Sequence, residues 1–350
     1  MRDAQPDLEL SYVGGVRGFE RRLVGTAMPY HQLLVRSLRS AGRDLHIVLD
    51  PLRLAASAPQ AWWLLGRLRP AAIFTTGGYL ALPLVAAARA RRIPTLLWEG
   101  NVIPGRATAA VGRLATRVAV SFPPTLAAFP GHSFVSGTPI RSFVGVDRAA
   151  ARASFGVATD ERLLLVFGGS QAVARITAAL GGALEAILHE WRVLHLAGEA
   201  GMPQALAVRE RLPEEIRERY EPVPLLTDRM ADALVAADLV LGRAGSSTCA
   251  EVTAVGVASI LVPYPYAGGH QAANAEWLTE HGAAVLVRDA ELEPARLTGA
   301  VSALRSDERR AEVAAAALRM GQRNAASTVA AELLAMAEGR PLPSLVETAP

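Results

Sequence analysis

Short apolar runs alternate with glycine-rich turns and helical patterns along most of the chain. Residues 163–167 are all apolar, which is typical of a strand buried on both faces of a parallel sheet. Residues 237–242 and 258–262 are also strand-like, and each leads through a polar loop into a helical pattern, which covers 249–255 after the first loop. This alternation predicts an α/β fold whose parallel strands end at one edge, where open α/β folds bind ligands.

The amino-terminal half repeats this pattern. We predict five strands there, at residues 8–13, 71–75, 92–98, 118–121 and 134–136. Glycine pairs follow two of them, at Gly14-Gly15 and Gly77-Gly78, and a third pair follows residues 163–167. One such pair is a weak signal, because many tight strand-to-helix turns need glycine whatever their function. Three of them indicate repeated βα units.

The two loops after residues 242 and 262 carry side chains suited to a nucleotide sugar. The first contains Arg243 and is followed by Glu251, and the second contains Gln271 and Asn274. A carboxylate accepts both hydroxyls of a ribose, and amide side chains suit sugar hydroxyls. The helix N-termini offer N–H groups and a positive dipole end to a diphosphate.

Each of these residues also has a purely structural interpretation. Thr248 and Glu251 match a capping box, in which both side chains bind N–H groups at the start of a helix. Gly245 fits any tight turn, and Gln271 and Asn274 fit a solvated helix start. The sequence leaves these alternatives open, although the coincidence of two polar motifs in neighbouring loops favours a ligand site.

Length and composition limit the class of protein. A chain of 350 residues exceeds what one core usually fills, so we expect two domains. No apolar run approaches the ~20 residues that span a bilayer, and no signal-peptide pattern is present, so a soluble or peripheral protein is expected. The single cysteine, Cys249, excludes an internal disulfide and is expected to be a buried helix residue.

Charge is distributed unevenly. Residues 1–140 carry 16 arginines and 7 acidic residues, a net charge of +9, and residues 141–350 carry 20 arginines and 26 acidic residues, a net charge of −6. The basic half predicts an anionic partner, but no nucleic acid, because a stripe of basic and aromatic residues is absent. Residues 60–69 form an amphipathic pattern with Trp62 and Trp63 beside arginines, which favours an anionic membrane surface. A core helix with a solvated edge is the alternative.

Six motifs follow one another in the chain. They are Gly77-Gly-Tyr79, Glu99-Gly-Asn101, Gly137-Thr-Pro-Ile-Arg141, Gly168-Gly-Ser-Gln171, Arg243-Ala-Gly-Ser-Ser-Thr-Cys-Ala-Glu251 and His270-Gln-Ala-Ala-Asn274. Their order and spacing resemble the MurG family of peptidoglycan glycosyltransferases over residues 11 to about 330. The resemblance implies an inverting, peripheral enzyme at the cytoplasmic face of the cell membrane. It would transfer N-acetylglucosamine from UDP-N-acetylglucosamine to undecaprenyl-diphosphate-linked muramoyl pentapeptide (lipid I), giving lipid II.

The resemblance also implies an architecture. The expected fold is GT-B, with two Rossmann-like doubly wound domains facing a cleft. We expect the acceptor and membrane-facing domain at residues 1–141, the UDP-N-acetylglucosamine-binding domain at 142–320, and a C-terminal helix and tail at 321–350. A helix over about 311–339 is expected to pack on the first domain. No Asp-x-Asp motif occurs, so neither a metal nor another cofactor is expected.

Site residues follow from the resemblance position by position. Glu251 is expected to bind the ribose hydroxyls, Gln271 and Asn274 the sugar hydroxyls, and Arg243 the leaving UDP together with helix N–H groups. Ser170 and residues 246–248 would bind the diphosphate. The expected donor-binding residues are Asn101, Arg141, Ser170, Thr227, Arg243, Ser246, Ser247, Thr248, Cys249, Ala250, Glu251, Gln271 and Asn274. The expected acceptor-binding residues are Gly77, Gly78 and Tyr79.

The chain departs from the family pattern near its start and before Glu99. The family begins with a strand and a Gly-Gly-Thr-Gly-Gly-His loop that serves the acceptor diphosphate, and no such loop occurs before Leu10. We therefore expect an upstream start or a truncated gene, with a poorly stable first domain and little activity in the chain as written. Trp98 replaces a family histidine, which leaves Glu99 as the candidate general base. A structural hydrogen-bond acceptor is its alternative role.

Other functions remain open at this level. A GT-B glycosyltransferase with another lipid or metabolite acceptor would carry the same donor loops. An inactive or split module that only binds a UDP-sugar and a nucleotide-sugar epimerase are further alternatives. Transfer of labelled sugar to lipid I distinguishes the first hypothesis from all of these.

Overall fold

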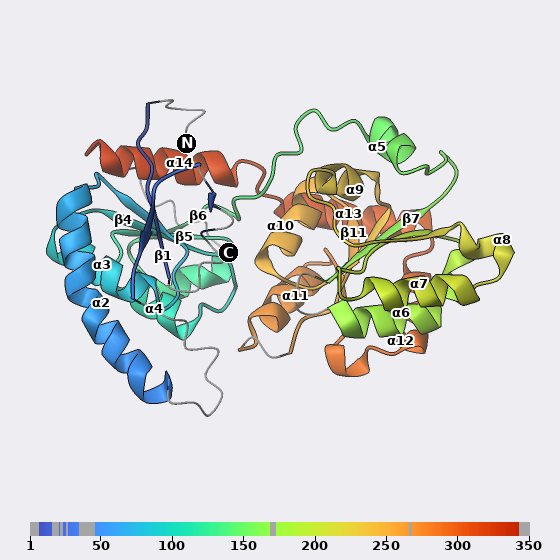
Figure 1. Cartoon of the computed structure of the whole chain (residues 1–350). Coiled ribbons are helices and arrows are strands. Elements are labelled where there is room, and N and C mark those ends of the chain that lie inside the picture. The colour runs from blue at the N-terminus through green and yellow to red at the C-terminus, as the bar shows by residue number, and fades with distance from the viewer. Residues whose placement is uncertain are drawn as a thin grey trace. The chain divides into compact units, whose positions relative to one another are not determined.

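The protein comprises two compact units, which are shown by a computed structural model (Figure 1). The structure describes residues 7–15, 21, 24–25, 27–34, 46–168, 173–265 and 268–342, apart from the side chains of residues 46–55 and 173. Unit 1 comprises Met1–Gly100, Pro104–Ser136 and Asn324–Pro350, and unit 2 comprises Asn101–Ile103 and Gly137–Arg323. Both contain parallel strands and helices, so the predicted α/β class is confirmed.

Unit 2 is built on six parallel strands in the order β12-β11-β10-β7-β8-β9. The strands are β7 (Leu163–Phe167), β8 (Arg192–Leu196), β9 (Tyr220–Val223), β10 (Leu239–Gly242), β11 (Ala258–Leu261) and β12 (Val285–Leu286). The chain adds β8 and β9 on one side of β7 and then crosses over to add β10, β11 and β12 on the other, which is a doubly wound order. Leu239 of β10 pairs with Leu164 of β7 and with Ala258 of β11. The carboxyl ends of these three strands therefore lie together.

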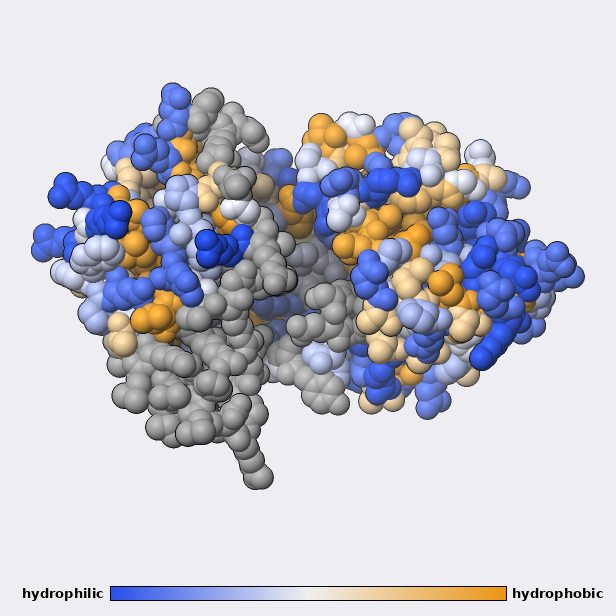
Figure 2. Space-filling view, viewed as in Figure 1, coloured by the Kyte–Doolittle hydropathy of each residue, from blue (hydrophilic) through white to orange (hydrophobic). Residues whose placement is uncertain are grey.

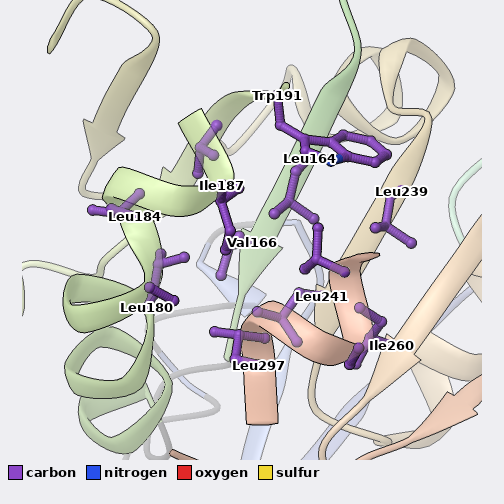
Figure 3. Packing of buried hydrophobic residues seen from close by; sticks show 14 of the residues in the cluster. Leu164, Val166, Leu180, Leu184, Ile187, Trp191, Leu239, Leu241, Ile260 and Leu297 are labelled. Carbon is purple, nitrogen blue, oxygen red and sulfur yellow. The ribbon is translucent and has the colours of Figure 1, made fainter. Parts of the chain in front are cut away.

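Helices flank the unit 2 sheet. They are α5 (Arg148–Ser154), α6 (Val173–Leu188), α7 (Met202–Arg211), α8 (Glu214–Arg217), α9 (Met230–Ala236), α10 (Ser246–Val255), α11 (His270–Glu280), η3 (Asp289–Glu291), α12 (Pro294–Ala303) and α13 (Asp307–Met320). Figure 3 shows Leu180, Leu184 and Ile187 of α6 on the same core cluster as Leu164 and Val166 of β7. All five are at most 2% exposed, and burial of each contributes about 1.5–3 kcal/mol. This burial accounts for the apolar run predicted as a strand.

Unit 1 contains a parallel sheet in the order β3-β4-β5-β6 and a separate parallel pair, β1-β2. The strands are β1 (Tyr12–Gly14), β2 (Tyr30–Gln32), β3 (Ile73–Thr75), β4 (Thr95–Glu99), β5 (Arg117–Val120) and β6 (Ser133–Val135). The helices are α2 (His46–Leu68), α3 (Ala81–Ala90), α4 (Arg106–Gly112), η2 (Pro123–Ala128) and α14 (Ala325–Ala337). Sequence patterns predicted β3 to β6 and a strand at 8–13 that overlaps β1, but they missed β2.

The helix predicted over about 311–339 is in fact two helices, α13 in unit 2 and α14 in unit 1. They separate after Gly321, where a Cβ atom would lie 2.6 Å from the carbonyl oxygen of Thr253. This close approach to the backbone of α10 requires glycine, which ends α13. α14 then packs on unit 1 in an apolar cluster that includes Leu96, Ala119, Val329, Leu333 and Met336.

Candidate functional site

The connection from β10 to α10 changes from strand to helix within three residues. β10 ends at Gly242, and α10 begins at Ser246 rather than at the predicted residue 249. Gly245 is the N-cap residue, and no side chain in the described part of the chain caps this helix. The capping-box interpretation of Thr248 and Glu251 is therefore wrong, because that motif needs its hydroxyl at the N-cap. The first turn brings N–H groups and a positive dipole end to the carboxyl edge of the sheet.

Glu251 lies on α10 and is held by Arg141. The Arg141 Nε atom donates to Glu251 Oε1 at 2.7 Å, a charge-assisted hydrogen bond between residues 110 positions apart. The Glu251 side chain is 8% exposed and that of Arg141 is 41% exposed, so the arginine reaches the carboxylate from the solvent side. A guanidinium has five N–H donors, and one bond to Glu251 does not exhaust this capacity.

Asn274 is fully buried on α11, although sugar hydroxyls were its predicted partners. Its Nδ2 atom donates to Asn101 Oδ1 and to the carbonyl oxygen of Ala244, both at 3.1 Å. Its Oδ1 atom accepts from the N–H of Val102 at 2.9 Å. Both amide N–H groups are thus bonded to protein oxygens. In this structure Asn274 and Asn101 hold residues 101–103 against the loop that precedes α10.

The loop between β11 and α11 is held by polar side chains from the first turn of α11. Gln271 Oε1 accepts from the N–H of Tyr264 at 2.9 Å. The His270 Nδ1 atom lies 2.7 Å from the carbonyl oxygen of Ile103. Gly269 has a φ of +80°, a conformation that favours glycine and lets the chain enter the helix. Gln271 therefore lies at the predicted edge of the sheet and supports the loop before its own helix.

Arg243 is buried at the carboxyl end of β10, where it was predicted to stabilise the leaving UDP. Its Nη1 atom donates to Asp289 Oδ1 at 2.5 Å and to the carbonyl oxygen of Val262 at 3.2 Å. Its guanidinium also lies over the ring of Tyr264. Asp289 thus pairs with the guanidinium predicted to stabilise UDP, and that role of Arg243 stays a prediction. Sequence analysis missed Asp289, although an acidic residue just after a strand of the same sheet was an available signal.

The remaining predicted donor residues occupy varied surroundings. Burial raises the pKa of the Cys249 thiol to about 12, which disfavours the thiolate and confirms a buried helix residue. Ser246, Thr248 and Ala250 are half-buried on α10, and Ser247 and Thr227 are exposed. Ser170 lies outside the described residues.

The predicted acceptor residues belong to unit 1. Gly77 and Gly78 follow β3 with φ angles of +78° and +82°, which favour glycine, and Tyr79 is half-buried. A Cβ atom at Gly77 would lie 2.7 Å from Thr108, so local packing alone accounts for this glycine. Glu99 ends β4 and is 4% exposed.

Comparisons with known proteins agree along nearly the whole chain. A family model described as the glycosyltransferase family 28 C-terminal domain matches residues 163–330, and the N-terminal domain model of that family matches residues 4–120. A Salinibacter ruber protein is 36% identical over 97% of this chain and 91% of its own, and a Nocardioides protein is 37% identical over 97% and 93%. The crystal structure of Acinetobacter baumannii MurG has a TM-score of 0.76 and 28% identity, covering 95% of this chain and 93% of that chain.

Two units with parallel sheets, together with matches to both domains of one glycosyltransferase family, define a glycosyltransferase of the GT-B class. Both relatives are named UDP-N-acetylglucosamine--N-acetylmuramyl-(pentapeptide) pyrophosphoryl-undecaprenol N-acetylglucosamine transferase. The chain belongs to glycosyltransferase family 28 and, within it, to the MurG family. The predicted GT-B fold and the family resemblance are confirmed.

Proposed function

We propose that this protein transfers N-acetylglucosamine from UDP-N-acetylglucosamine to lipid I and thereby makes lipid II for peptidoglycan. The observation that carries the proposal is the 36% and 37% identity to two proteins named as this transferase, over 97% of the chain. The carboxylate of Glu251, which Arg141 holds near the start of α10, supports binding of the sugar donor. Such an activity serves cell wall biogenesis and, through it, cell shape and division.

The donor would bind at the carboxyl edge of the unit 2 sheet. Glu251 would accept the two ribose hydroxyls, and the first turn of α10 with its serine and threonine hydroxyls would bind the diphosphate. Arg141 replaces Arg243 as the cation proposed to face the leaving group. Its side chain is partly exposed beside Glu251, whereas Arg243 is buried against Asp289.

The transfer itself would be a single displacement with inversion. The acceptor hydroxyl oxygen forms a bond to the anomeric carbon as the bond from that carbon to the UDP oxygen breaks, and the electron pair leaves with UDP. A general base takes the hydroxyl proton. Helix N–H groups and Arg141 would stabilise the charge that develops on the diphosphate.

Transfer of radiolabelled N-acetylglucosamine tests this function directly. A protein with this function converts lipid I and labelled UDP-N-acetylglucosamine into labelled lipid II and UDP. Label transfer to a different lipid but not to lipid I would favour another acceptor. Isomerisation of the UDP-sugar without any acceptor would indicate an epimerase, and binding without turnover would indicate a binding module.

Glu99 is proposed as the general base in this reaction. Replacing it with glutamine keeps its size and removes its basicity, so we expect kcat to fall about 100-fold, a typical loss for general-base catalysis. Donor affinity should not change. Lipid II formation under saturating substrates measures the first quantity, and calorimetry with UDP measures the second.

Glu332 provides a matched control for Glu99. It is another buried glutamate of unit 1, also 4% exposed, and it accepts from Arg117 Nε at 2.8 Å. If Glu99→Gln lowers kcat no more than Glu332→Gln does, Glu99 is a structural hydrogen-bond acceptor and not the base.

The exposed face of α2 supports contact with an anionic membrane surface. Ala61, Leu64 and Leu65 of this helix are buried, whereas Trp62 and Trp63 are exposed. The tryptophans thus lie on the exposed side of a helix whose other side packs in the core, and the predicted alternative, a core helix with a solvated edge, also fits this arrangement. Arginines lie against both indole rings, Arg91 over Trp62 at 4.0 Å from the ring centroid and Arg67 over Trp63 at 5.6 Å.

Aromatic rings beside arginines suit the headgroup region of a bilayer. On the side of unit 1 that carries α2 and α3, strongly hydrophilic residues and smaller hydrophobic areas lie side by side (Figure 2). No helix among the described residues is long and apolar enough to cross a bilayer. We therefore propose peripheral binding at the cytoplasmic face of the cell membrane, through this surface of unit 1.

Removal of both indole rings should weaken membrane binding. We expect the Trp62→Ala, Trp63→Ala double variant to bind vesicles that contain phosphatidylglycerol at least about tenfold more weakly than the wild type. Sedimentation with vesicles measures this affinity. The control is Leu206→Ala with Leu225→Ala, which removes two exposed side chains of unit 2. Equal binding by both double variants would contradict the proposed membrane surface.

A further inference from the structure

Asp289 lies between two arginines at the carboxyl edge of the unit 2 sheet. Its side chain is 6% exposed. Oδ1 accepts from Arg243 Nη1 at 2.5 Å, and Oδ2 lies 3.4 Å from Arg175 Nε. Arg175 also donates through Nη2 to the carbonyl oxygen of Asp289 at 2.6 Å. One buried carboxylate thus organises two guanidinium groups.

These three residues come from three separate connections of the sheet. Arg175 is in the first turn of α6, which follows β7, while Arg243 follows β10 and Asp289 follows β12. Arg243 also donates to the carbonyl oxygen of Val262, directly after β11. The cluster therefore links the segments that follow four of the six strands.

Net stability is a poor explanation for such a cluster. Desolvation of two buried charges offsets most of their attraction, so a buried ion pair stabilises a fold little compared with apolar side chains of the same size. Its bonds do, however, define the positions of the groups that it joins. Ligand-binding groups need such support, because small errors in their positions weaken binding.

We propose that Asp289 is a positioning residue of the UDP-sugar site, an inference that rests on the proposed function. Asp289 holds Arg243, and Arg243 holds the carbonyl groups after β11 beside the loop that begins α10. Asp289 does not touch the donor. Its loss would leave the Arg243 charge buried without its partner, and the loops on both sides of Arg243 would move.

The same unit offers a matched control at the opposite edge of the sheet. Asp238 precedes β10 and accepts from Arg148 Nη2 at 2.7 Å and from Arg152 Nη1 at 2.9 Å. It also accepts from the N–H of Leu163 at the start of β7. Asp238 and Asp289 each bind two arginines, but Asp238 lies at the amino ends of the strands and Asp289 at the ligand edge.

The test compares UDP binding by the full-length wild type, Asp289→Asn and Asp238→Asn, using calorimetry under conditions in which all three are folded. We expect Asp289→Asn to raise the Kd for UDP about tenfold, because the groups that bind UDP would be displaced. Asp238→Asn should leave this Kd unchanged. In lipid II synthesis, Asp289→Asn should raise KM for the sugar nucleotide more than it lowers kcat. Urea unfolding would show whether both variants lose stability.

Three results would overturn the inference. An unchanged Kd for Asp289→Asn would remove the positioning role, and a lower Kd would show that Asp289 withholds Arg243 from the diphosphate. An equal rise in the Kd for UDP in Asp238→Asn would show that either substitution loosens unit 2 as a whole. If Asp289→Asn does not fold, Arg175→Gln replaces it, with an expected rise of about threefold and the same interpretation. Absence of UDP binding by the wild type would overturn the proposed function itself.

Discussion

Replacing Glu251 with alanine should raise the Kd for UDP about 1000-fold. The carboxylate is proposed to accept both ribose hydroxyls, and each hydrogen bond to a charged group contributes about 1.5–3 kcal/mol. Loss of both should cost about 4 kcal/mol, which corresponds to about 1000-fold in affinity. Calorimetric titration of the variant with UDP measures the change. The effect should appear equally with UDP and UDP-N-acetylglucosamine, because the ribose is common to both.

Glu312→Ala is the control for this experiment. Glu312 is an exposed glutamate on α13 of the same unit and pairs with Arg309 one turn earlier. We expect its removal to leave donor affinity unchanged. An affinity for UDP that survives Glu251→Ala would show that Glu251 serves the fold rather than the ligand, and the proposed donor site would be wrong.

Acid should destabilise unit 2 through His195. This residue of β8 is fully buried, with Nδ1 2.8 Å from the Tyr220 hydroxyl and Nε2 3.3 Å from Thr177 Oγ1. Burial disfavours the imidazolium and lowers the pKa of His195 from 6.5 to about 4. In the unfolded chain His195 binds a proton below about pH 6.5, whereas in the folded chain it binds one only below about pH 4. Stability therefore falls as the pH falls through this window, by about 3 kcal/mol in total.

Urea unfolding of unit 2 at pH 7 and at pH 4 measures this contribution. His195→Gln removes the titrating group and retains a polar side chain. Between pH 7 and pH 4, the free energy of unfolding of this variant should therefore fall by about 3 kcal/mol less than that of the wild type. His281→Gln is the control, because His281 is exposed and its loss should leave the pH dependence intact. If His195→Gln showed the same acid sensitivity as the wild type, another group would be responsible.

Local sequence patterns predicted strands correctly where an uninterrupted run of apolar residues is buried. The apolar run at 163–167 became β7, and the two runs before the polar loops became β10 and β11. Patterns failed at helix boundaries. The helix predicted over about 311–339 is broken after Gly321 by the backbone of α10, and Thr248 is not a cap because α10 begins at Ser246. The first outcome involves a residue distant in sequence, because Gly321 lies against the backbone of Thr253.

Charge and chemistry were harder to predict than strands. The amphipathic pattern at 60–69 identified a helix, but only packing showed that Trp62 and Trp63 point outward. Arg243 was predicted to serve the ligand because arginine suits a diphosphate. Its partner Asp289 lies 46 positions away, and nothing near Arg243 in the sequence indicates that its charge is neutralised.

The order of apolar runs, glycine turns and motifs was enough to assign this chain to an α/β fold and to the MurG family, because burial periodicity and short motifs are local properties. Tertiary structure alone decided which polar groups meet. Arg141 and Glu251 are 110 positions apart, and Asn101 and Asn274 are 173 positions apart. Their contacts exist because parallel strands bring loops from distant parts of the chain to one edge, where burial determines whether a side chain binds another protein group or remains accessible to a ligand.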